Sequence, residues 1–162
     1  MDAIPVVLDF VRELIVPLLV FGALFIYSII RGQRALTSII LSLYVSLLIS
    51  LEFPYYELLY QKLTFLGKEG INMLMFAIFT ALGTILFEKI LSRLLDETAF
   101  EGIWKKLVLA VLGTTLLMAY SYHVLPVIQF IDPGAEIAKI FAPQAYFFWW
   151  LILPLAGLFL IL

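Results

Sequence analysis

The sequence contains no cysteine and few charged residues. Its 162 residues include 10 Lys and Arg, 12 Asp and Glu and one His, and charged side chains make up only 14% of the chain. The absence of cysteine excludes disulfides and thiol chemistry. Hydrophobic residues reach 64%, whereas soluble domains average about 45–50% apolar and about 25% charged residues. This composition leaves too little polar surface for a water-soluble protein and predicts a membrane protein.

Five stretches carry no charged side chain at all: residues 14–30, 35–51, 71–87, 107–125 and 145–162. As helices rising about 1.5 Å per residue, they approach the roughly 30 Å hydrocarbon layer of a bilayer. A backbone in lipid must satisfy its own hydrogen bonds, and these stretches lack the polar alternation of barrel strands. We therefore predict an all-α, polytopic helical membrane protein, with residues 1–162 forming one membrane domain.

The last of these stretches leaves two interpretations open. Residues 145–162 are long enough to form a fifth transmembrane helix at the C-terminus, with Trp149 and Trp150 in an aromatic belt. Pro154 and Gly157 also permit a segment that re-enters or lies on the membrane. The sequence thus predicts four transmembrane helices and a fifth at the C-terminus, with a re-entrant piece as the alternative.

Three shorter amphipathic segments flank the spans, at residues 4–13, 54–65 and 88–97. The first two are predicted to lie at the membrane interface, because they combine apolar steps of three and four residues or tyrosines with charged side chains. The third extends the helix of residues 71–87 beyond the bilayer. Pro17 predicts a kink in the first span.

The first two spans are separated only by Arg31, Gly32, Gln33 and Arg34. Arginine is costly in hydrocarbon, so these residues predict a tight turn at the membrane surface and a helical hairpin. Six Lys and Arg residues fall on the side of this turn and the 88–106 connection, and four on the other. The positive-inside bias therefore places the turn in the cytoplasm and the N-terminus outside.

Four serines follow one another at every fourth position of the second span: Ser38, Ser42, Ser46 and Ser50. This spacing puts them on one face of a helix. Either the face packs against another helix through small side chains, or it lines the water path of a homo-oligomeric pore. Small residues in the third and fourth spans offer partner faces for packing: Thr80, Gly83, Thr84, Gly113 and Thr114.

The sequence offers no motif for catalysis, metal binding or cofactor binding. His123 is the only histidine, whereas a zinc site needs three or four ligands; we expect it to be simply hydrated near the interface. Nucleophile motifs, phosphate-binding loops and aspartates within spans are absent from the sequence. We therefore expect a non-enzymatic protein whose partners are the lipid bilayer and other membrane proteins or further copies, not nucleic acid.

The order of these features resembles the colicin V production (CvpA) family of small bacterial inner-membrane proteins. Arg31, Gly32 and Arg34 resemble the arginine-glycine turn that joins the first two spans of that family. Residues 82–95 resemble the helical extension of the third span, and Gly113 matches a glycine of the fourth span.

The resemblance covers residues 4–126 and includes departures from the family pattern. Ala35 stands where the family tends to have a glutamate, and Lys105 and Lys106 replace an aspartate-arginine pair. The resemblance implies a multi-pass protein of the bacterial cytoplasmic membrane, with a role in envelope integrity or export and no known active site.

Overall fold

A computed structural model of the chain describes residues 3–63, 67–94, 102–125 and 135–161. Within these ranges every regular element is an α-helix. The helices are α1 (Ala3–Arg31), α2 (Gln33–Glu52), α3 (Tyr56–Lys62), α4 (Lys68–Leu94), α5 (Ile103–His123), α6 (Ala135–Phe141) and α7 (Gln144–Ile161). Five of them, α1, α2, α4, α5 and α7, are long and apolar enough to cross a membrane. The predicted all-helical fold is confirmed, and the five helices fit a multi-pass membrane protein.

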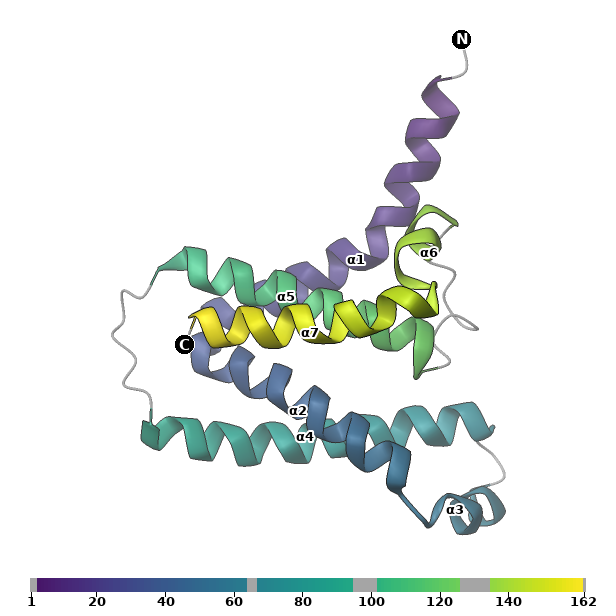
Figure 1. Cartoon of the computed structure of the whole chain (residues 1–162), viewed down its shortest axis with the longest axis vertical. Coiled ribbons are helices and arrows are strands. Elements are labelled where there is room, and N and C mark those ends of the chain that lie inside the picture. The colour runs from purple at the N-terminus through teal and green to yellow at the C-terminus, as the bar shows by residue number, and fades with distance from the viewer. Residues whose placement is uncertain (1–2, 64–66, 95–101, 126–134, 162) are drawn as a thin grey trace.

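Two helices form the centre of the bundle. α2 packs against α4 on one side and against α5 and α1 on the other, and α5 also packs against α1 and α7 (Figure 1). In the membrane-length apolar stretches of α2 and α5, half of the residues are buried. The buried share is 6% for the stretch in α1 and 11% for each of those in α4 and α7. The three outer helices therefore present most of their surface to the surroundings.

That outer surface is strongly apolar. Leu18, Ile85 and Phe159 on the three outer helices are 66%, 64% and 87% exposed. A water-soluble protein rarely exposes continuous apolar patches larger than a few hundred Å². Lipid, rather than water, is the solvent that suits these faces.

The turn between α1 and α2 is shorter than the four residues predicted from the sequence. Arg31 is the last residue of α1 and Gln33 the first of α2, so Gly32 alone lies between the two helices. Gly32 has a φ of 90°, a conformation that glycine adopts without the steric cost of a Cβ atom. Its amide donates a hydrogen bond to the Ser28 carbonyl at 2.9 Å. The arginines belong to helix ends because their long side chains reach the polar surface from there.

Two of the predicted amphipathic segments are continuous with longer helices. Residues 4–13 and the first span form the single helix α1, which contains Pro17 and changes direction along its length, with its N-terminal part projecting away from the bundle (Figure 1). α4 continues from the third span into the expected extension as far as Leu94; residues 95–97 lie outside the described part. The remaining segment, 54–65, contains the separate short helix α3, and its residues 64 and 65 lie outside the described part.

The helix α6 was not predicted. The sequence before it, Asp132, Pro133 and Gly134, has the composition of a turn, and these three residues lie outside the described part. Seven residues are too few to show a helical period in the sequence, so the pattern gave no signal. α7 follows as one continuous helix with Pro154 inside it.

Candidate functional site

The serine face of α2 lies against α4. Ser38, Ser42 and Ser46 are all 0% exposed. Their hydroxyls donate to the backbone carbonyls of Arg34, Ser38 and Ser42, at 2.9, 2.6 and 2.6 Å. Each hydroxyl therefore has its hydrogen-bond acceptor within its own helix. The small serine side chains allow the neighbouring helix to approach this face closely.

Ser50, the fourth member of the stripe, has a different role. It is half-buried, and its hydroxyl lies 2.9 Å from the hydroxyl of Tyr56 at the start of α3. The ring of Phe53 packs nearby against Tyr56 and against Phe79 of α4, with centroid distances of 5.2 and 5.3 Å. This end of the stripe thus fixes the α2–α3 corner instead of the α2–α4 contact.

Two of the predicted partner residues on α4 meet the serine face directly. A Cβ atom on Gly83 would lie only 3.1 Å from Cβ of Ser42 and 3.2 Å from its hydroxyl. Oγ1 of Thr80 lies 3.1 Å from Oγ of Ser46 and 2.8 Å from the Phe76 carbonyl, so its proton is shared between two acceptors. Thr84 donates to the Thr80 carbonyl at 2.7 Å. The structure therefore joins Ser42, Ser46, Thr80 and Gly83 in one interface.

The predicted residues of α5 belong to a different contact. A Cβ atom on Gly113 would lie 3.0 Å from Cδ1 of Leu24 in α1 and 3.6 Å from Cγ1 of Ile40 in α2. Gly113 thus marks the place where α1, α2 and α5 meet. Thr114 beside it donates to the Ala110 carbonyl at 2.7 Å and is 9% exposed.

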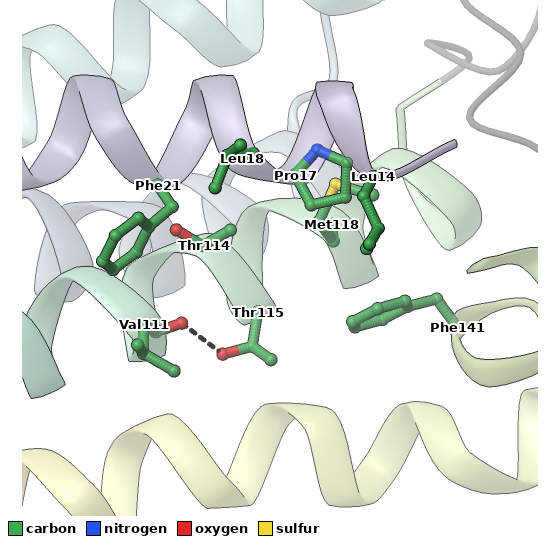
Figure 2. A pocket seen from close by; sticks show the side chains of 9 residues that line it. All are labelled: Leu14, Pro17, Leu18, Phe21, Val111, Thr114, Thr115, Met118 and Phe141. Atoms are coloured by element: carbon green, nitrogen blue, oxygen red, sulfur yellow. Dashed lines mark hydrogen bonds between the residues drawn. The ribbon is translucent and has the colours of Figure 1, made fainter. Parts of the chain in front are cut away.

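A pocket of about 350 Å³ lies between α1 and α5 (Figure 2). Its two threonines turn their hydroxyls to their own helix: Thr115 donates to the Val111 carbonyl at 2.6 Å, the bond drawn in Figure 2, and Thr114 bonds as described above. The remaining lining is apolar. The pocket can therefore take an apolar group but offers it no polar recognition. Its lining residues are Leu14, Pro17, Leu18, Phe21, Val111, Thr114, Thr115, Met118 and Phe141.

The arginine-glycine turn adjoins the end of α4. Nη2 of Arg31 lies 3.8 Å from Oε1 of Glu88, with side chains that are 58% and 36% exposed. Nη1 of Arg34 donates to the Ser92 carbonyl at 3.5 Å. A pair this exposed contributes only about 0–1 kcal/mol to stability. Figure 1 shows the α1–α2 turn, the end of α4 and the start of α5 at one end of the bundle, where the expected cytoplasmic cations lie.

His123 is not the freely hydrated side chain that we expected. It ends α5, and its Nε2 lies 2.8 Å from the carbonyl oxygen of Phe141, the last residue of α6. Its ring also packs 4.4 Å from that of Phe147 in α7. Nε1 of Trp150 donates to the neighbouring carbonyl of Ile140 at 3.1 Å. The last carbonyls of a helix have no hydrogen-bond partner within the helix. His123 and Trp150 provide partners for two of these carbonyls at the end of α6.

Sequence reasoning missed two further contacts of α7. The hydroxyl of Tyr44 in α2 donates to the Leu151 carbonyl, and a Cβ atom on Gly157 would lie 2.5 Å from Cδ1 of Leu112 in α5. A lone tyrosine and a lone glycine in apolar stretches carry no spacing pattern, so only the packed structure identifies them.

The chemistry of the described residues is that of helix packing. Over the described ranges, no group of three His, Asp or Glu side chains lies close enough to hold a metal ion. No family model, no curated protein and no solved structure matched the chain. Membership of the colicin V production family therefore stays a prediction.

Proposed function

We propose that the chain is a non-enzymatic integral protein of the bacterial cytoplasmic membrane, with a role in envelope integrity or export. The location and the role come from the resemblance of its turn, helical extension and Gly113 to the colicin V production family. One structural observation supports the non-enzymatic part: the hydroxyls of Ser38, Ser42 and Ser46 donate to carbonyls of their own helix, and the three side chains are buried. In this proposal the chain acts through its contacts with lipid and with other membrane proteins.

The proposal includes an orientation. The α1–α2 turn, with Arg31 and Arg34, shares one end of the bundle with the start of α5, which carries Lys105 and Lys106 (Figure 1). The positive-inside bias supports placing this end in the cytoplasm and the N-terminus outside.

The burial of the serines weighs against the alternative of a pore lined by them. Water could reach Ser42 and Ser46 only if α4 left the face that it covers, because Gly83 lies directly against Ser42. Opening such a path would also expose α2 backbone that is now packed tightly against another helix.

Single cysteines test the two ideas on a chain that has no cysteine of its own. We expect Ser42→Cys and Ser46→Cys to resist a small water-soluble thiol reagent, because both positions are fully buried. Ile103→Cys, at a position that is 72% exposed at a helix end, is the reactive control. Rapid labelling of both buried positions would favour the pore.

Deletion of the gene in its source bacterium tests the envelope role. We expect the deletion to sensitise cells to detergent or osmotic shock, and the wild-type gene to restore resistance. His123→Ala should also restore resistance when the protein reaches normal abundance, since the proposal assigns no catalysis to His123. Failure of this variant at normal abundance would count against the non-enzymatic proposal, and a deletion strain with unchanged resistance would contradict the envelope role.

A further inference from the structure

A second and larger cavity, which we call the α1–α4 groove, has a volume of about 630 Å³. Tyr27 and Arg31 of α1 line it on one side and residues between Met73 and Glu88 of α4 on the other, with Ile39 of α2 and Leu117 of α5 between them. α4 is held mainly by α2 and by the short α3. The face of α4 that looks toward α1 and α5 is therefore left open.

The α4 wall of the groove is formed by small side chains in the middle of the helix. Ala77, Thr80, Ala81 and Thr84 all line it. The hydroxyls of Thr80 and Thr84 bond to carbonyls of their own helix at 2.8 and 2.7 Å. The body of the groove thus offers apolar contact, and its width follows from the small size of these residues.

One end of the groove is charged. Arg31 and Glu88 line this end and lie 3.8 Å apart. Arg34 lies close by, as its contact with the Ser92 carbonyl shows, and Lys89 follows Glu88 with an exposed side chain. Among the described side chains at or beside this end, these three cations stand against the one carboxylate of Glu88, which gives them a net positive charge.

The dimensions of the groove favour one kind of occupant. Residues 73 to 88 cover about 22 Å of helix. Spread over that length, the cavity has a cross-section of about 28 Å², which is roughly 6 Å across. Carbon atoms pack about 4 Å from their neighbours, so one alkyl chain fits. An α-helix of about 10 Å diameter does not.

We propose that the α1–α4 groove holds one acyl chain of an anionic phospholipid, whose phosphate is bound by Arg31 at the charged end. The apolar body of the groove matches the acyl chain, and the net positive charge at the charged end matches the anionic headgroup, as in basic pockets between transmembrane helices. Glu88 opposes the anion and also keeps Arg31 at the mouth. This inference goes beyond the proposed envelope role and does not depend on it.

Native mass spectrometry of the full chain in detergent tests the headgroup contact, with phosphatidylglycerol and phosphatidylcholine of identical acyl chains as probes. We expect one phosphatidylglycerol to be retained at least fivefold more than phosphatidylcholine. Arg31→Gln should lower that retention about tenfold, because it removes a charge-assisted contact. Glu88→Gln should raise it two- to threefold. Arg93→Gln removes a charge from the same helix end without touching the groove and should change nothing.

Filling the groove tests the acyl chain. Ala81→Phe should abolish retention of phosphatidylglycerol, whereas Leu82→Phe, on the neighbouring face that is 55% exposed, should not. Millimolar inorganic phosphate should fail to displace the lipid, because a free anion lacks the chain.

Three results would overturn the proposal: equal retention of both lipids, unchanged retention in Ala81→Phe, or a lipid-free dimer that Ala81→Phe dissociates. The last would assign the groove to a second copy of the chain. If Arg31→Gln fails to fold, the opposite sign expected for Glu88→Gln still decides the headgroup contact.

Discussion

The two sides of α2 are packed with different chemistry. Toward α4 it presents Ser42 and Ser46, which meet Gly83 and Thr80. Toward α5 and α1 it presents aliphatic side chains such as Ile40, which meets Gly113. Both contacts are close, but between the described residues of α2 and α4 only one hydroxyl bond, from Thr80 to Ser46, crosses from helix to helix. The serines therefore contribute mainly through small size, since in lipid no hydrophobic effect draws helices together and close packing must do so.

The largest expected effect is overpacking of the polar side. Gly83→Ile should destabilise the folded protein by about 3 kcal/mol, because even its Cβ would press on Ser42 and the rest of the side chain must separate α2 from α4. The measurement is unfolding by SDS in detergent micelles, followed by circular dichroism. The matched control is Gly22→Ile, at a position where a Cβ meets nothing within 4 Å. Equal losses for the two variants would contradict this contact.

The apolar contact between α5 and α7 should also respond to repacking. Gly157→Ala should cost about 1–2 kcal/mol, because its new methyl group would lie 2.5 Å from Cδ1 of Leu112. Leu112→Ala in the same chain removes the obstructing atoms, so the double variant should be more stable than the sum of the single effects predicts, by about 1 kcal/mol. Strict additivity in the same unfolding assay would show that the two residues do not touch.

A smaller effect is expected for the bond that ties α2 to α7. Tyr44→Phe removes the hydroxyl that donates to the Leu151 carbonyl, and we expect a loss of about 1 kcal/mol. Tyr55→Phe makes the same chemical change on a side chain that is 58% exposed and should be neutral. A neutral Tyr44→Phe would mean that α7 is held by apolar contacts alone.

The smallest expected effect separates size from hydrogen bonding within the serine face. Ser46→Ala should cost about 0.6 kcal/mol, the typical strength of a side-chain bond between transmembrane helices. Ser38→Ala should be neutral, because its hydroxyl bonds only to the carbonyl of Arg34 in its own helix. The difference between the two midpoints in a thermal unfolding experiment is the readout. A larger loss of stability for Ser38→Ala than for Ser46→Ala would contradict this prediction.

The serine face shows how far sequence reasoning could go toward the site. A four-residue spacing fixes Ser38, Ser42 and Ser46 on one side of a helix whatever surrounds it, because the helical repeat is local. The sequence did not show which helix covers that side, because Gly83 in α4 and Gly113 in α5 both lie in clusters of small residues that could pack against it. The structure assigns Gly83 to the serines and Gly113 to α1 and Ile40.

His123 and α6 show where sequence reasoning stopped. The histidine looked solvated because the sequence gave no sign of a helix after residue 134. In the structure its Nε2 lies 2.8 Å from the Phe141 carbonyl. Such a contact joins residues 18 positions apart and has no local pattern.

The sequence by itself determined that the chain is helical, which five stretches suit lipid, and where the arginines force a turn. These are properties of single segments, since hydrophobicity, charge and helical period act over neighbouring residues. The tertiary structure alone decided that α4 covers the serines, that Gly157 admits Leu112, and that a groove with a charged end lies between α1 and α4. Those outcomes depend on how whole helix surfaces fit one another, which no single segment encodes.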